Sequence, residues 1–156
     1  METHNQFMQK AIELSKESVQ NGGGPFGAVI VKNGHIIAEA SNSVTQDHDP
    51  TAHAEINAIR KAAKVLNTFD LSGTIIYSSC EPCPMCLSAI YWARIDSLFF
   101  ANTRHDAKRI GFDDEFLYNE IQRPINERSI PTKQILRDKA LSAFRLWESS
   151  DNKVQY

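Results

Sequence analysis

The chain has 156 residues, and its hydrophobic content of 42% is enough to build a buried core, which excludes a disordered protein. Its 17 Lys and Arg against 19 Asp and Glu give a formal net charge of −2, without the basic excess typical of proteins that bind long nucleic acids. Because the sequence has neither an apolar run of the roughly 20 residues that span a bilayer nor a secretory signal pattern, we expect a cytoplasmic protein with no membrane or nucleic-acid partner.

The first elements are a helix and a hairpin. Apolar residues at helical spacing over residues 7–19, followed by three glycines, predict an amphipathic helix. Two apolar runs, 27–32 and 35–40, flank the dipeptide Asn33-Gly34. This dipeptide between two such runs is a strong signal for a two-residue hairpin turn. We therefore predict two antiparallel strands.

The middle of the chain predicts a strand–helix–strand unit. A second helix is expected over 49–66, with Pro50 near its first turn. An apolar strand over 74–79, a helix over 83–94 and a strand over 96–101 follow. This order and spacing predict a right-handed crossover that joins two parallel strands.

The C-terminal third has weaker patterns. Residues 113–121 and 141–148 are expected to be helical, and 129–136 is expected to be a strand. The sequence contains no repeat, linker or low-complexity tract. It therefore predicts one α/β layered domain over 1–156 with a mixed sheet.

Potential metal ligands form two local groups. His53 stands at the expected start of the second helix, and Cys83 and Cys86 stand at the expected start of the third. One imidazole and two thiolates suit Zn²⁺ and leave a fourth position open for water, as in catalytic zinc sites. Because helix N-termini carry partial positive charge and stabilise thiolates, we expect two helix N-termini to converge on one zinc ion.

Glu55 is the candidate for proton transfer at this zinc site. A carboxylate beside the open position can take a proton from water and pass it on. The alternative is a non-catalytic binding module, in which Cys80 joins Cys83, Cys86 and His53 to close a structural site. Cys80, however, falls at the end of the preceding strand, and a structural site has no use for Glu55. We therefore interpret Cys80 as a small buried residue.

At these residues the sequence resembles the cytidine/deoxycytidylate deaminase superfamily, whose signature is His-x-Glu followed by Pro-Cys-x-x-Cys. The matching segments, in chain order, are Gly24–Val31, Asn42, Pro50–Glu55 and Cys80–Cys86. Since tRNA adenosine deaminases share these segments, they do not select a substrate. Three later segments, Tyr91–Arg94, Gly111–Phe116 and Tyr156, are similar to the bacterial guanine deaminase family. With these included, the resemblance covers nearly the whole chain.

The resemblance implies a three-layer α/β/α fold of the cytidine deaminase type with a central mixed sheet of about five strands. It implies one zinc ion per chain and hydrolysis of guanine to xanthine and ammonia, in which Glu55 moves the protons. It also implies a homodimer in which the C-terminal segment, about 140–156, is exchanged between subunits. The purine base would then be the small-molecule partner.

The resemblance also assigns substrate contacts. Asn42 would hydrogen-bond the purine ring, and Phe26 and Trp92 would line its faces. Asp114 would contact the amino edge and assist proton transfer, and Tyr156 would reach the site from the exchanged tail. Each residue has a simpler interpretation: Asn42 as a turn residue, the aromatic residues as core, Asp114 as part of an acidic helix start, and Tyr156 as a chain end.

Two other enzymatic functions share the same motifs. A tRNA adenosine deaminase needs a basic surface, and the nearest candidate, 104–109, is interrupted by Asp106. A deaminase of guanosine or another aminated ring is a closer alternative, because one base pocket can accept related rings.

Overall fold

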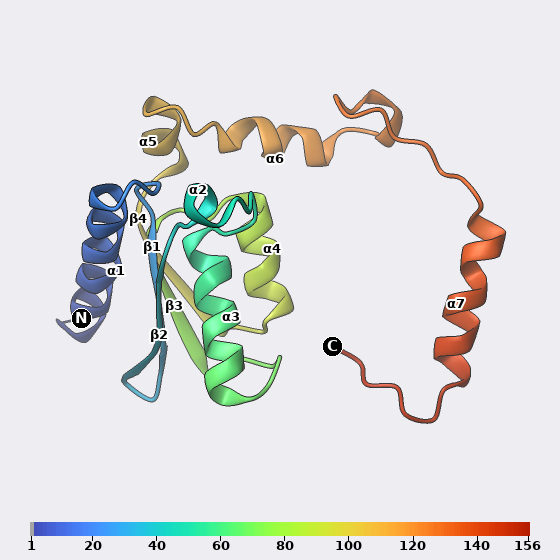
Figure 1. Ribbon diagram of the computed structural model, residues 1–156, viewed down its shortest axis with the longest axis horizontal. Coiled ribbons are helices and arrows are strands. Elements are labelled where there is room, and N and C mark those ends of the chain that lie inside the picture. The colour runs from blue at the N-terminus through green and yellow to red at the C-terminus, as the bar shows by residue number, and fades with distance from the viewer. Residues whose placement is uncertain (1) are drawn as a thin grey trace. The chain divides into compact units, whose positions relative to one another are not determined.

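The computed structural model describes residues 2–156 (Figure 1). The chain divides into two compact units, Met1–Leu117 and Tyr118–Tyr156. The elements in chain order are α1 (Glu2–Gln20), β1 (Gly27–Lys32), β2 (His35–Ser41), α2 (Val44–Asp47), α3 (Ala54–Leu66), β3 (Thr74–Cys80), α4 (Pro84–Trp92), β4 (Ser97–Asn102), α5 (Arg104–Arg109), α6 (Asp114–Gln122), the 3₁₀ turn η1 (Ile125–Glu127) and α7 (Arg137–Ser149). Within the described residues, no helix combines the length and apolar character that a membrane span requires.

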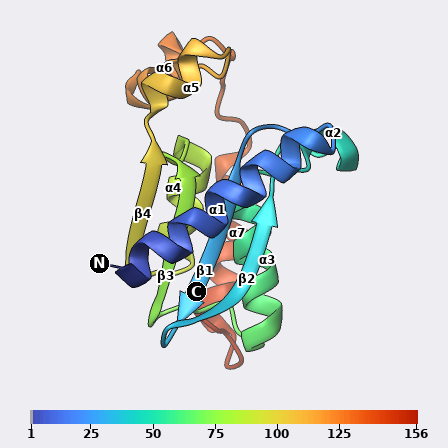
Figure 2. The same ribbon diagram turned by 90° about the vertical axis from the view of Figure 1, so that its left-hand side faces the viewer.

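The first unit is built on a mixed sheet of four strands in the order β2-β1-β3-β4. Strand β1 pairs antiparallel with both β2 and β3, whereas β3 and β4 are parallel and joined through α4. Helix α1 covers one face of the sheet, and α3 and α4 cover the other (Figures 1 and 2). The predicted three-layer α/β/α fold is thus confirmed.

Alternation along β1 divides the core between these two faces. Val29 and Val31 pack in the cluster on the α1 side, and Ala28 and Ile30 pack in the cluster on the α3 side. Successive side chains of a strand point to opposite faces, so a strand covered on both sides is apolar throughout. This explains the continuous apolar run of β1.

The hairpin prediction is confirmed. Asn33 and Gly34 have φ angles of 51° and 77° between β1 and β2. Positive φ at both central residues is what a type I′ turn requires, and Asn-Gly adopts it at little cost. The expected parallel crossover from β3 through α4 to β4 is confirmed as well.

The helix expected over 49–66 begins later than predicted, at Ala54. Asp49 Oδ1 accepts hydrogen bonds from the Thr51 backbone N–H at 2.8 Å and from the Thr51 hydroxyl at 2.7 Å. This turn stands where the sequence predicted the first helical turn, so Pro50 lies in a loop. The short helix α2, which the sequence pattern did not predict, precedes that loop.

The sheet of the described residues has four strands, where about five were expected, and the missing strand belongs to the second unit. Its expected strand over 129–136 is wrong, because these residues have no regular structure, and the described sheet therefore has four strands. The Ser129 N–H donates to the Glu120 carboxylate at 2.7 Å, and Pro131 has no N–H to donate. Both features remove donors that a strand would need. The helices expected over 113–121 and 141–148 are confirmed as α6 and α7.

Candidate active site

Two helix N-termini carry the predicted zinc ligands. His53 is the N-cap residue of α3, and Cys83 is the N-cap residue of α4, with Pro84 opening that helix. Both N-cap residues are extended, with ψ angles of 156° and 167°, and neither side chain caps its own helix. Their ring and thiol are therefore available for a metal. Cys86 lies one turn further along α4.

The three side chains converge as expected. His53 Nδ1 lies 3.6 Å from Cys83 Sγ and 3.4 Å from Cys86 Sγ. The three potential ligand atoms all lie within 4.8 Å of one another. In tetrahedral zinc, bond lengths near 2.0 and 2.3 Å place a nitrogen and a sulfur ligand about 3.5 Å apart. The donor set and its spacing therefore fit one zinc ion with a fourth position open.

The electrostatics of the metal-free site favour one thiolate. Hydrogen bonds from the Cys86 thiol and from His53 lower the pKa of Cys83 to about 4. The pKa of Cys86 is raised, because its thiol holds the proton that the two sulfurs share and because it is buried. The hydrogen bond to Cys83 also raises the pKa of His53. Zinc binding by both thiolates therefore requires release of the Cys86 proton.

Cys80 lies outside this cluster, at the end of β3. Its Sγ is 3.7 Å from the backbone oxygen of Thr103, and burial raises its pKa to about 12. Cys80 is not part of the group of His53, Cys83 and Cys86, whose ligand atoms lie within 4.8 Å of one another, so its sulfur is not placed to bind the same metal ion. This agrees with the interpretation of Cys80 as a small buried residue.

Glu55 is the buried acid of the site. It lies in the first turn of α3, is 6% exposed, and its Oε1 accepts a hydrogen bond from the Ser78 hydroxyl at 2.9 Å. Burial raises the pKa of Glu55, and the hydrogen bond from Ser78 opposes that rise. A raised pKa favours the protonated form of this carboxyl group, which suits a role in general acid–base catalysis.

A cavity of about 250 Å³ opens beside these groups. It is lined by Gly24, Phe26, Asn42, Val44, Thr45, Pro50, His53, Glu55, Glu81, Cys83, Phe112 and Asp114. The rings of Phe26 and Phe112 meet edge to face, with centroids 4.9 Å apart. The volume is below the roughly 300–1,000 Å³ of pockets for drug-sized ligands, so it suits a single heterocyclic ring system.

Asn42 and Asp114 both line this cavity, as the resemblance implied. Asn42 is 8% exposed, and its Oδ1 accepts the Val44 N–H at 3.2 Å, so it is a turn residue as well. This bond occupies the side-chain oxygen and leaves the amide nitrogen as a donor. Asp114 opens α6 and is half-buried. Burial, followed by the charge of Cys83, raises the pKa of Asp114.

Trp92 is not among the residues that line the cavity of the first unit. Trp92 ends α4, roughly 13 Å along the helix from Cys83 and roughly 9 Å from Cys86, and is 65% exposed. Tyr156 ends the second unit and is 71% exposed. Phe112 and Glu81, to which the sequence pattern gives no role, also line the cavity. Each stands two residues before a predicted site residue, Asp114 or Cys83, within a matched motif, and this position is the one sequence signal for them.

The comparison with known families settles the class of protein. A family model described as the cytidine and deoxycytidylate deaminase zinc-binding region matches residues 1–102. This match spans β1 to β4 and both ligand-bearing helix ends. The chain belongs to this family. Zinc is its metal, in agreement with the His/Cys cluster of the first unit.

The similarity to individual relatives extends beyond the region of the family model. The chain is 54% identical over 154 residues to the guanine deaminase of Bacillus subtilis (strain 168), covering 98% of this chain and 99% of the relative. An X-ray structure of guanine deaminase from Bacillus subtilis matches with a TM-score of 0.96 at 54% identity, covering 98% of both chains. The tRNA-specific adenosine deaminase of Buchnera aphidicola subsp. Baizongia pistaciae is 44% identical over 121 residues, or 77% of this chain and 75% of the relative.

Proposed function

We propose that this deaminase hydrolyses guanine to xanthine and ammonia. The observation that carries the proposal is a buried carboxylate, Glu55, beside a zinc-type ligand cluster in a cavity sized for one base. The near-full-length identity to a guanine deaminase favours guanine over the substrates of the more distant tRNA deaminases. In the reaction a water oxygen bonds to C2 of the purine, the bond from C2 to the amino nitrogen breaks, and ammonia leaves.

His53, Cys83 and Cys86 would hold the metal in this proposal. Zinc supplies Lewis acidity when bound, which makes a water molecule nucleophilic at neutral pH. The two helix N-termini stabilise the negative charge of the thiolates. Because Cys86 must lose its proton to act as a ligand, metal affinity should fall as the pH is lowered.

Glu55 would move the protons. It accepts one proton from the attacking water and delivers it to the ring nitrogen, and it then accepts the proton of the hydroxyl group now bonded to C2 and delivers it to the departing amine. The Ser78 hydroxyl holds Oε1 at 2.9 Å and so fixes the orientation of the carboxyl group. Burial excludes bulk water as a competing acid or base.

Three cavity residues would recognise the base. The amide nitrogen of Asn42 would donate to an acceptor of the purine ring, since its oxygen already accepts the Val44 N–H. Asp114 would accept from the ring N–H and amino N–H of guanine, and it would assist proton transfer. Adenine cannot present that pair of donors, so a buried acceptor at this place selects against it. Phe26, supported by Phe112, would pack against the ring.

A substrate panel tests this proposal. Purified chain loaded with zinc is assayed for ammonia release with guanine, guanosine, cytosine, cytidine and an adenosine-containing tRNA anticodon stem-loop. We expect release from guanine and formation of xanthine in equal amount. Turnover of the stem-loop with guanine untouched would leave the zinc chemistry intact and overturn the assignments of Asn42 and Asp114.

We also propose that residues 1–156 act as one deaminase domain within a homodimer, in which the segment 140–156 is exchanged. The first unit supports a dimer with exposed aromatic side chains on α4 and β4, where Tyr91, Trp92 and Phe100 are between 46% and 77% exposed. Exposed aromatic groups of this kind mark interaction surfaces rather than solvent-facing ones. In such a dimer, Trp92 and Tyr156 would contribute to substrate binding.

The second unit supports the exchange. Helix α7 has no buried residue in the described chain, although Phe144 and Trp147 belong to it. An amphipathic helix owes most of its stability to the packing of its apolar face, so α7 requires a partner surface. A second copy of the chain is the partner that we propose.

Mixed dimers test the exchange. A full-length chain with Glu55→Gln is refolded together with a chain that has Glu55 but lacks residues 151–156. If the tail closes the partner's pocket, the mixed dimer combines an intact Glu55 with an intact tail in one site, and activity appears that neither chain has alone. If each tail serves its own chain, mixing restores nothing, and the exchange is wrong.

A further inference from the structure

One loop carries both a proposed metal ligand, His53, and a proposed base-binding residue, Asn42. This loop, residues 42–53, connects β2 to α3 and includes the short helix α2; Asn42 is its first residue and His53 its last. Both side chains line the cavity. The position of a bound base relative to the metal therefore depends on the shape of this loop.

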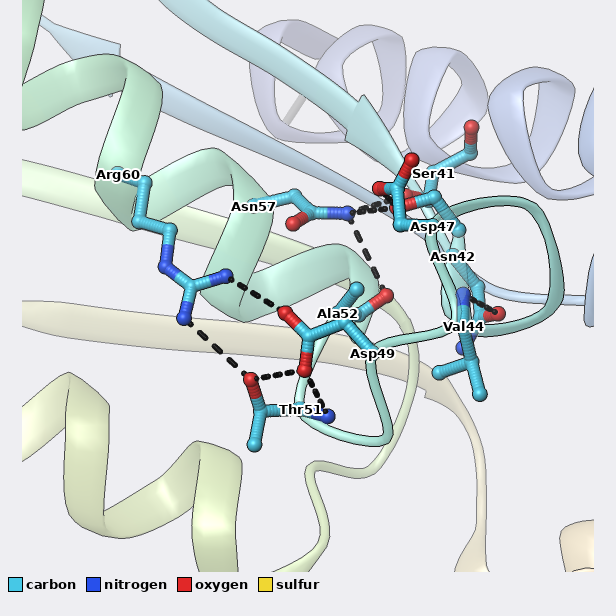
Figure 3. A network of polar contacts seen from close by, with 10 residues as sticks. Ser41, Asn42, Val44, Asp47, Asp49, Thr51, Ala52, Asn57 and Arg60 are labelled. Atoms are coloured by element: carbon cyan, nitrogen blue, oxygen red, sulfur yellow. Dashed lines mark hydrogen bonds and ion pairs between the residues drawn. The ribbon is translucent and has the colours of Figure 1, made fainter.

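Asn57, in the second turn of α3, ties the two ends of the loop together (Figure 3). Its Nδ2 lies 3.1 Å from the backbone oxygen of Ser41, 2.9 Å from the Ser43 hydroxyl and 3.3 Å from the backbone oxygen of Ala52. The two hydrogens of the amide are shared among these three acceptors. Ser41 and Ser43 flank Asn42, and Ala52 precedes His53, so one side-chain nitrogen contacts both neighbours of Asn42 and the neighbour of His53.

The hydrogen bonds of Asn57 hold the side of the loop that faces α3 and the end of β2, here called the inner side. The Ser43 N–H donates to the Ala52 oxygen at 2.9 Å, which brings the same two segments together a second time. The outer side is held separately. There Arg60 approaches the Asp49 carboxylate at 3.6 Å and donates to the Thr51 hydroxyl at 3.3 Å (Figure 3). Arg60 is exposed, whereas Asn57 is half-buried.

We propose that Asn57 is a positioning residue, which sets the distance between the Asn42 amide and His53 and thereby places the base over the metal site. Asn57 is not among the residues that line the cavity, so it acts through Asn42 and His53 and not by touching the substrate. This inference rests on the proposed function for its substrate. A misplacement of about 1 Å in a reacting complex can reduce the rate on the order of 100-fold.

Two substitutions at Asn57 and one control separate positioning from general loop stability. Asn57→Ala removes the donor, and Asn57→Asp keeps the shape while turning an oxygen toward three acceptors. Arg60→Met removes the contacts of Arg60 with Asp49 and Thr51 on the other side of the same loop and leaves the Asn57 contacts in place. KM and kcat for guanine are measured for each variant, together with the rate at which a chelator removes zinc.

We expect Asn57→Ala to raise KM for guanine by about tenfold or more and to accelerate zinc removal, and Asn57→Asp to have the larger effect. We expect Arg60→Met to change neither quantity by more than about twofold. The decisive comparison is a double-mutant cycle. In an Asn42→Ala background, Asn57→Ala should no longer raise KM, because the group that it positions is absent, whereas the faster zinc removal should persist.

Two outcomes would overturn the inference. One is that Asn57→Ala raises KM by the same factor in the unmodified chain and in the Asn42→Ala background. The other is that Asn57→Ala changes neither KM nor the rate of zinc removal. Should Asn57→Ala fail to fold, Ser43→Ala removes the acceptor at 2.9 Å and must show the same dependence on Asn42. If the unmodified chain fails to turn over guanine, the proposed function is wrong on its own, and the zinc-removal rates still decide whether Asn57 positions His53.

Discussion

Replacement of Glu55 by Gln removes the proposed proton carrier while it keeps the shape of the side chain. Glu55 is 6% exposed, and Gln offers the Ser78 hydroxyl the same acceptor oxygen that it now contacts at 2.9 Å. The residues His53, Cys83 and Cys86 are unchanged, so zinc should remain at one ion per chain. The substitution therefore isolates proton transfer.

The magnitude follows from the number of proton transfers assigned to this one carboxyl group. General acid–base catalysis contributes roughly 10²- to 10⁴-fold, and Glu55 would serve both the attacking water and the departing amine. We expect kcat to fall by at least about 10³-fold, which corresponds to roughly 4 kcal/mol of barrier. KM should change little, because Asn42, Asp114 and Phe26 keep their places.

The assay is ammonia release from guanine, with zinc measured on the same samples. Glu39→Gln is the matched control, because it makes the same chemical change outside the cavity, in a half-exposed side chain paired with Lys10. A Glu55→Gln chain with one zinc per chain and a kcat within tenfold of the unmodified chain would refute the assignment of Glu55 as proton carrier.

The same substitution carries a stability prediction for the metal-free chain. Burial raises the pKa of Glu55 in the folded state above the unfolded value of about 4.3. The folded state then binds the proton more tightly, so stability is highest below that pH and is lost as the pH rises through the folded pKa. Gln does not titrate, so the metal-free variant should be more stable than the metal-free unmodified chain at pH 7. The difference should shrink below pH of about 4, as measured by denaturant unfolding.

Three further changes test the metal, the tail and the pocket wall. Cys86→Ala should bring bound zinc well below one per chain by elemental analysis, whereas Cys80→Ala should retain it; equal loss from both would mean that the ligand set is wrong. Deletion of residues 151–156 should impair guanine turnover while circular dichroism stays that of the intact fold, and an unchanged rate would show that the tail does not close the pocket. Gly24→Ala places a methyl group 3.3 Å from the Asn42 amide and should raise KM for guanine several-fold; an unchanged KM would mean that this wall does not touch the base.

Short sequence motifs predicted the hairpin and the two helix ends of the site, because neighbouring residues determine the structure there. Asn33-Gly34 predicted the hairpin because few other residue pairs adopt two consecutive positive φ angles. The motifs around His53 and Cys83 predicted converging helix ends, because both stand at helix starts and the partial positive charge of helix N-termini stabilises thiolates.

The errors arose where a local signal has two structural outcomes. Asp49 before Pro50 is found at helix starts and in turns alike, and the side-chain bonds of Asp49 to Thr51 selected the turn. The strand expected over 129–136 had apolar residues, but a strand also needs free N–H donors and an edge to pair with. Pro131 has no N–H, and the N–H of Ser129 donates to Glu120, nine residues earlier in the chain. Phe112 was missed for a related reason, since its role depends on the ring of Phe26, more than 80 residues earlier in the chain.

Zinc titration of the metal-free chain, with xanthine formation from guanine followed at each addition, tests the central claim most directly. The proposed site predicts that guanine turnover rises in proportion to bound zinc and reaches its maximum at one ion per chain, with one ammonia released per xanthine. Guanine turnover that is independent of zinc, or a chain that binds one zinc ion and forms no xanthine, would contradict it.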